Sequence, residues 1–135
     1  ENLSEKELID LQCLQGRGVF GIEMRIVDEN NQELPWDGVA FGSRKVKGPW
    51  VASGYYGLSQ VHGSEGCPVD ELGWFDTGDV ATINPQGYMK ITDRTKDVIK
   101  TGGEWVSSIE IENAAVNHPG VTEAAAIGRY HPKWT

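Results

Sequence analysis

Apolar and polar residues alternate between Gly21 and Asp28, a pattern that predicts a β-strand with one buried face. Glu23 and Arg25 occupy its polar face, and Asn30-Asn31 supplies the turn that follows. Asn84-Pro85-Gln86-Gly87 has the composition of a hairpin turn between two further strands. These two strands are expected over 79–83 and 88–92. Further strands are expected over 39–47, 97–100, 104–106 and 121–127.

Two segments have the pattern of capped helices. Ser4 with Glu7 forms a capping-box pattern, and a leucine stripe follows until Gly16 ends the helix. Ser107 with Glu110 repeats the capping box, and this second helix is expected to end before His118-Pro119-Gly120. Between Ser53 and Gly73 the chain is rich in glycine and polar residues, which predicts a surface loop anchored by Tyr55-Tyr56.

These elements predict an α+β chain in three parts. Residues 1–16 form a helical segment, and residues 17–93 form a mainly antiparallel β subdomain. Residues 94–135 form a small α+β unit, because the pattern changes near Asp93-Arg94 from a strand meander to strand, strand, helix and strand.

Charge and cysteine content narrow the function classes. The formal net charge of -8 disfavours a nucleic-acid partner, because phosphate backbones repel an acidic surface. No apolar run approaches the ~20 residues of a membrane span, and the first residues lack the basic region of a leader. Cys13 and Cys67 show no metal-type spacing, and two reduced thiols in a cytoplasmic protein are expected, with a disulfide left open.

The first cluster with candidate chemistry is Gly73-Trp74-Phe75-Asp76-Thr77-Gly78-Asp79. Its glycines allow close backbone approach to a ligand, and Asp79, at the start of a predicted strand, offers acceptors for two vicinal hydroxyls of a ribose. The alternative is an Asp that caps a tight turn, and composition alone favours that alternative.

Two further clusters follow in the chain. In 93–100, Arg94 is a candidate for a nucleotide contact and Lys96 and Lys100 for steering anions, although alternating charges usually mark a solvated surface. In 101–112, paired glycines precede a capped helix, which fits either a ligand passage or a plain hairpin turn. Trp105 either stacks on a flat ring or fills a core.

Together, in this order, the three clusters resemble the adenylate-forming superfamily of acyl-CoA synthetases, adenylation domains and beetle luciferases. Gly73-Trp74-Phe75 with Thr77-Gly78-Asp79 is similar to the ribose-binding motif, and 93–97 to the interdomain linker. Gly102-Gly103-Glu104-Trp105 with Val106-Ser107-Ser108 resembles the opening of the small C-terminal domain in medium- and long-chain fatty acyl-CoA ligases. Many members carry Pro where Ser108 stands, and 131–134 is similar to the fatty acyl subgroup.

The resemblance implies a two-step reaction in which ATP and a fatty acid form an acyl-adenylate that coenzyme A then attacks. It implies a distorted, barrel-like β subdomain and a truncated lid that rotates about Lys96. Several residues then acquire implied roles: Asp79, Arg94, Glu104 and Trp105 in ATP or AMP binding, Lys100 in catalysis, and Gly102 and Gly103 beside the path of coenzyme A.

The resemblance also defines what this chain lacks. The family's phosphate loop, the motif with the Mg²⁺-binding Glu and the late catalytic Lys have no counterpart here, so Mg²⁺ ligands are expected outside the chain. The chain alone is therefore expected to be inactive and to pair with the remainder of its own polypeptide. Arg44 stands where relatives tend to have an apolar residue, which brings the packing of that strand into question.

Two alternatives remain open. One is a non-catalytic, truncated nucleotide-binding module. The other is an adenylating enzyme that passes the acyl group to a carrier protein or to oxygen rather than to coenzyme A.

Overall fold

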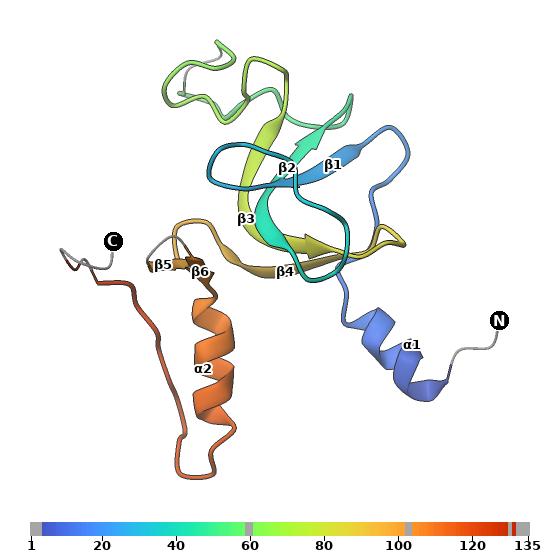
Figure 1. Cartoon of the computed structure of the whole chain (residues 1–135). Helices are drawn as coiled ribbons and strands as arrows, with labels where there is room; N and C mark the ends of the chain where they lie inside the picture. Colours follow the sequence, from blue (N-terminus) through green and yellow to red (C-terminus); the bar gives the residue numbers. More distant parts are fainter. Residues whose placement is uncertain (1–3, 59–60, 102–103, 130, 132–135) are drawn as a thin grey trace. The chain divides into compact units, whose positions relative to one another are not determined.

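The computed structural model describes residues 4–58, 61–101, 104–129 and 131, and divides the chain into two compact units (Figure 1). The first unit is Glu1–Ile91 and the second is Thr92–Thr135. Gly102 and Gly103 lie outside the described residues. Each unit is described by itself.

The first helix, α1 (Glu5–Gln12), begins as the capping box predicts. Ser4 Oγ accepts a hydrogen bond from Glu7 N at 3.3 Å, and Ser4 N donates to Glu7 Oε2 at 2.8 Å. This reciprocal pair satisfies two amide groups that a helix start otherwise leaves unpaired. No residue of α1 is buried, and Leu8 is 47% exposed, so the cap rather than packing defines this helix.

The first unit is built on a four-stranded sheet in the order β1-β2-β3-β4. Its strands are β1 (Glu23–Val27), β2 (Phe41–Lys47), β3 (Phe75–Ile83) and β4 (Met89–Arg94). Each strand pairs with the next one in the chain, and β1–β2 and β2–β3 are antiparallel. The strand order is that of a meander, so the expected mainly antiparallel sheet is confirmed, while its barrel-like distortion stays a prediction.

The predicted turns produce this meander. Asn31 adopts a left-handed backbone conformation with φ 61°, and Asp28 Oδ1 accepts from Asn30 N and Gln32 N. Asn84 Oδ1 likewise accepts from Gln86 N and Tyr88 N and closes the β3–β4 hairpin. Asparagine and aspartate therefore make both turns through their own side chains.

One cluster of the core consists of Ile26, Ala81, Ile83 and Met89, with Met24 and Leu34 packed against it. Val27 and Val80 are buried on the opposite face of the sheet. The expectation that the opposite face of β1 is solvated is wrong at Arg25. Its guanidinium lies 4.2 Å from the centre of the Trp74 ring, and its side chain is only 13% exposed. Aromatic stacking and ion pairing make it favourable to cover an arginine in this way.

The segment after α1 covers the free edge of β4. Gln15 N donates to Met89 O at 2.9 Å, and Met89 N donates to Gly16 O at 2.8 Å. Gln15 Oε1 accepts from Ile91 N at 2.6 Å. These bonds satisfy backbone groups that an uncovered edge strand leaves open for unwanted pairing.

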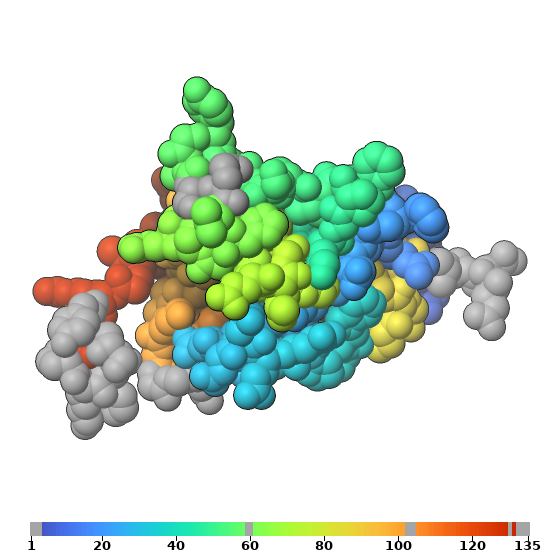
Figure 2. All heavy atoms as spheres, turned by 90° about the horizontal axis from the view of Figure 1, so that it is seen from above, coloured from blue at the N-terminus to red at the C-terminus, as the bar shows by residue number. Residues whose placement is uncertain are grey.

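The predicted loop between β2 and β3 contains no strand among its described residues and lies at the surface, as the green atoms of Figure 2 show. Only half of its aromatic anchor forms. The Tyr55 ring packs edge-on against Phe75 with centroids 5.7 Å apart, whereas Tyr56 is fully exposed. The stronger anchor is Asp70, which the sequence pattern did not single out.

Asp70 fastens the end of this loop to the sheet. Its Oδ1 accepts from Leu72 N and Trp74 N, and its Oδ2 lies 3.4 Å from Arg25 and 3.5 Å from Lys45. Partial burial raises the pKa of Asp70, but the backbone hydrogen bonds and the charge of Lys45 outweigh it, so the pKa is below its ordinary value.

The second unit contains β5 (Ile99–Thr101), β6 (Glu104–Val106) and α2 (Ser108–Val116). β5 and β6 form an antiparallel pair, and Ser107 caps α2 by accepting from Glu110 N at 3.2 Å. The strand expected over 121–127 is absent, and these residues run as extended coil. Ala126 N bonds to the Glu112 carboxylate rather than to a neighbouring strand, because a strand needs partner backbone and the described residues supply none there.

The two cysteines are not joined by a disulfide. Both Cys13 and Cys67 are free thiols. In the part of the chain that the structure describes, no helix is long and apolar enough to cross a membrane.

Replacing Asp70 tests how the loop is held. We expect Asp70→Ala to lower the free energy of unfolding at pH 7 by roughly 2–3 kcal/mol, because two backbone amides and two cations lose their acceptor. Because the folded-state pKa is lowered, this contribution is complete above the unfolded value and disappears as pH falls through the folded one. Urea denaturation at pH 7 and pH 3 should show the difference shrinking, and the exposed Glu71→Ala serves as control.

Candidate functional site

The sequence Thr77-Gly78-Asp79 forms an irregularity within β3. Ser43 of β2 pairs with Val80, and Lys45 pairs with Asp76, so the single residue Arg44 faces three residues of β3. Gly78 has φ 74°, a conformation that side-chain-bearing residues rarely adopt, and Asp76 Oδ1 accepts from Gly78 N at 2.8 Å. Such bulges re-aim side chains and occur often beside binding sites.

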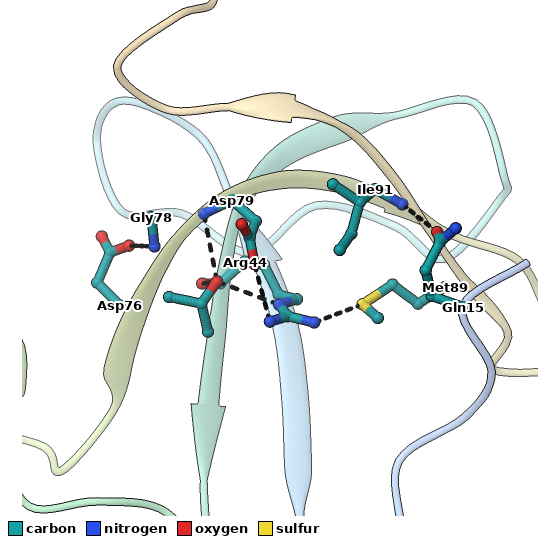
Figure 3. Close-up of polar contacts among 8 residues, drawn as sticks. Gln15, Arg44, Asp76, Gly78, Asp79, Met89 and Ile91 are labelled. Carbon is teal, nitrogen blue, oxygen red and sulfur yellow. Dashed lines mark hydrogen bonds and ion pairs between the residues drawn. The ribbon is translucent and has the colours of Figure 1, made fainter.

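Arg44 fills the space opposite this bulge, and Figure 3 shows its side chain extended between Asp79 and Met89. Nη2 donates to Asp79 Oδ2 at 2.9 Å, Nε donates to Thr77 Oγ1 at 3.1 Å, and Nη1 contacts Met89 Sδ at 3.1 Å. Thr77 Oγ1 in turn donates to Arg44 O at 3.1 Å. Each of the three guanidinium nitrogens therefore has one acceptor.

These contacts resolve the question that the sequence raised about Arg44. Ile26 lies directly opposite Arg44 in the β1–β2 ladder, so both side chains are on the core face of the sheet. The aliphatic stem of Arg44 covers the rim of the core, while its charge is neutralised by Asp79. The strand packs because the cation has a partner, and the motifs of the sequence do not link these two residues.

Asp79 lies within β3 and not at the start of a strand as expected, because β3 already begins at Phe75. Its side chain is 23% exposed. Oδ2 is engaged by Arg44, whereas no hydrogen bond from the described residues reaches Oδ1. Oδ2 of the carboxylate is thus held by Arg44, and Oδ1 is available to accept a hydrogen bond.

The second unit contains a buried carboxylate that the motif reading had not assigned a role. Asp93 is 2% exposed, and its Oδ2 accepts from Ser108 N at 2.7 Å and from Ser108 Oγ at 2.9 Å. Its Oδ1 accepts from Arg94 N at 2.7 Å. Asp93 therefore joins the end of β4 to the start of α2, where a negative charge also suits the helix dipole.

The predicted linker residues form a turn directly after Asp93. Arg94 O accepts from both Asp97 N and Val98 N at 2.9 Å, and the side chains of Arg94 and Lys96 are exposed. A cavity of about 530 Å³ adjoins this turn and includes Asp93, Arg94, Lys96, Asp97 and the start of α2 in its lining. Thr95 Oγ1 is buried without a hydrogen-bond partner among the described residues.

The remaining candidates lie on the β5–β6 pair. Lys100 is directly opposite Trp105 in the ladder, and Lys100 Nζ lies 5.0 Å from the centre of the Trp105 ring. The backbone of Glu104 pairs with Thr101. Gly102 and Gly103, the expected coenzyme A passage, lie outside the described residues.

The structure thus brings together Lys100 with Trp105, and Asp79 with the unforeseen Arg44. Asp79 and Arg94 belong to different units, so their convergence on one sugar stays a prediction. The signal for Arg44 was present in the sequence as a cation at an apolar position. What was missing was the strand register that places it opposite Asp79.

No group of three or more histidine, cysteine or acidic side chains suited to a metal occurs in the described part of the chain.

Comparison with known proteins gives a consistent set of relatives, although no family model matches the chain. It is 52% identical over 120 residues to a 3-methylmercaptopropionyl-CoA ligase of Ruegeria lacuscaerulensis, which covers 89% of this chain and 21% of the relative. It is 44% identical over 134 residues to a long-chain-fatty-acid–CoA ligase of Thermus thermophilus, covering 99% and 24%. The chain spans about a fifth to a quarter of these relatives.

Solved structures agree. ATP-bound MatB from Rhodopseudomonas palustris has a TM-score of 0.72 and 35% identity, covering 90% of this chain and 24% of that one. The o-succinylbenzoate CoA synthetase MenE from Bacillus subtilis, in complex with its acyl-adenylate intermediate, has a TM-score of 0.73 and 28% identity, covering 98% and 26%.

Ser108 offers a test of how Asp93 holds α2. Proline suits the first position of a helix, but Ser108→Pro removes both donors to buried Asp93 and leaves the carboxylate underpaired. We expect a loss of roughly 2–3 kcal/mol of protection against hydrogen exchange in α2 amides. Ser108→Ala, which keeps the backbone donor, should lose about half as much, and equal protection in all three proteins would contradict this role.

Proposed function

The chain belongs to the adenylate-forming acyl-CoA ligases, and from this premise we propose that the full-length protein activates a carboxylic acid with ATP and transfers it to coenzyme A. The observation that carries the proposal is the ordered, half-open carboxylate of Asp79 at a bulge of β3. Relatives whose names specify CoA ligation match along nearly the whole chain, which supports the same reaction.

In this proposal Asp79 accepts hydrogen bonds from the ribose hydroxyls of ATP. A carboxylate suits this task because it offers only acceptors, and hydrogen bonds to it are charge-assisted. Arg94, exposed at the turn after β4, contributes a second nucleotide contact from the other unit. ATP-bound MatB is among the structures most like this chain, which supports a nucleotide as ligand.

The turn at Arg94–Val98 serves in this proposal as the hinge between the two half-reactions, with Lys96 as its pivot. Lys96 is exposed, so its ammonium stays hydrated when the backbone rotates. A buried hydroxyl without a partner costs about 1–3 kcal/mol, so the orphaned Thr95 Oγ1 indicates that this turn is not fully satisfied in the present conformation. Short turns of this kind absorb the backbone change in domain closure.

The β5–β6 pair carries the residues proposed to reach the active site in one orientation of the small unit. Trp105 presents a flat ring beside adenylate or pantetheine, and Lys100, stacked on that ring, supplies a charge for the reacting carboxyl or phosphate. Glu104 lies on the same strand as Trp105 and completes the proposed set. Gly102 and Gly103 stand in the connection, where a missing side chain leaves room for the thin pantetheine arm.

The acyl substrate is proposed to be a medium- or long-chain fatty acid. The Thermus thermophilus relative is named for long-chain fatty acids, but the Ruegeria lacuscaerulensis relative is named for 3-methylmercaptopropionate. Transfer to a carrier protein is the second candidate for the acceptor. The chain alone is proposed to be inactive, with the rest of its polypeptide as its partner.

The first half-reaction gives the direct test. In the full-length protein we expect fatty-acid-dependent exchange of labelled pyrophosphate into ATP, and Asp79→Ala should lower kcat/KM for ATP by about 10- to 100-fold. This range corresponds to losing one or two charge-assisted hydrogen bonds. Glu65→Ala, which removes an exposed carboxylate of the surface loop, should leave the exchange unchanged. A wild-type protein with no acid-dependent exchange would rule out the proposed function.

The hinge is tested by separating the two steps. Lys96→Pro fixes one backbone angle of the turn, so thioester formation should fall by about tenfold or more relative to pyrophosphate exchange. Lys96→Ala keeps the backbone free and should retain both rates within a factor of a few. An equal loss in the two steps for Lys96→Pro would argue against a pivot at this position.

A further inference from the structure

We propose that Arg44 is the positioning residue for Asp79, and that the protein's preference for a ribose over a deoxyribose nucleotide depends on this ion pair. The inference rests on the proposed function only in taking a nucleotide sugar as the ligand of Asp79. It concerns a cation that lies on the same face of the sheet as the core residue Ile26.

Asp79 is bonded to a guanidinium that is itself held by other contacts. Arg44 contacts Thr77, Met89 and Asp79, one through each of its three nitrogens. The bond of 2.9 Å from Nη2 to Oδ2 therefore restrains the rotation of the Asp79 carboxylate. No described residue donates a hydrogen bond to Oδ1. A ligand hydroxyl would therefore meet an acceptor that is already ordered.

The ion pair also lowers the entropic cost of binding. An aspartate on a strand loses side-chain freedom when it binds a ligand, and this ordering opposes binding. Arg44 removes this cost before the ligand arrives. It also neutralises a carboxylate that would otherwise repel the phosphates of an approaching nucleotide, an effect that matters in a chain of net charge -8.

The backbone of the bulge also contacts Arg44. The bulge inserts Thr77, Gly78 and Asp79 opposite Arg44 alone, and the hydroxyl of Thr77 both accepts from Arg44 Nε and donates to Arg44 O. Asp79 N approaches the same hydroxyl at 3.3 Å. Side chains of the predicted ribose motif thus hydrogen-bond to Arg44. An apolar residue at position 44 would have no guanidinium to donate to them.

The experiment measures sugar preference rather than affinity alone. Amide shifts of the 135-residue chain are followed by NMR during titration with AMP and with 2′-deoxy-AMP. In the wild type we expect AMP to bind about tenfold more tightly, the worth of one hydrogen bond to a charged acceptor. Arg44→Leu should weaken AMP binding several-fold and reduce the preference to about twofold or less, while Arg44→Lys retains an intermediate preference.

The matched control is Lys45→Leu. Lys45 is the next residue of β2, is buried to a similar extent and is also paired with an aspartate, but that aspartate is Asp70. This variant should keep the tenfold preference. Circular dichroism of each variant checks the fold, and Arg44→Lys keeps the comparison available should Arg44→Leu not fold.

The outcomes are distinct from those of the proposed reaction. An unchanged AMP preference in Arg44→Leu, a parallel loss for both nucleotides, or tighter AMP binding would overturn the positioning role. So would a wild-type chain in which neither nucleotide shifts the amides around Asp79. Pyrophosphate exchange is not needed for this measurement, so failure of the ligase reaction and failure of the Arg44 assignment are read from separate data.

Discussion

The contact between Arg44 and the bulge of β3 is the constraint from which the first unit is best understood. One residue of β2 faces three of β3, and that mismatch requires both a glycine with positive φ and a side chain long enough to fill the gap. Arg44 fills it with its stem on the core side and its charge at the rim. The same contact that lets the sheet continue also fixes the carboxylate that the proposed function depends on.

Three aspartates show how environment assigns different tasks to one side chain. Asp93 is buried and has its two oxygens fully engaged by Arg94 N and Ser108, so it holds α2 and has no capacity for a ligand. Asp70 is saturated by two amides and two cations and fastens a loop. Asp79 alone combines an ordered position with an oxygen that the described residues leave open. Among these three, hydrogen-bond satisfaction separates the two carboxylates that hold structure from the one proposed to bind a ligand.

Local patterns predicted well where neighbouring residues decide the outcome. The capping box at Ser4, the asparagine turns and the start of α2 follow from side chains bonding to backbone within four residues, so they were visible in the sequence. The strand expected over 121–127 failed because pairing needs a partner that composition cannot supply. Arg25 was expected in solvent, yet Trp74 covers it, and nothing local signals a contact between residues 49 positions apart.

By itself the sequence determined the caps, the turns, the meander of β1–β4 and the three motifs whose order indicates the family, because each depends on short-range chemistry or on residue identity. The tertiary structure alone decided that Arg44 meets Asp79, that Asp93 is a buried link to α2, and that Asp70 holds the loop. These contacts join residues 15 to 45 positions apart. The contact of Arg44 with Asp79 depends on the register of β2 and β3, and a shift of one residue in that register would turn the side chain of Arg44 to the opposite face of the sheet.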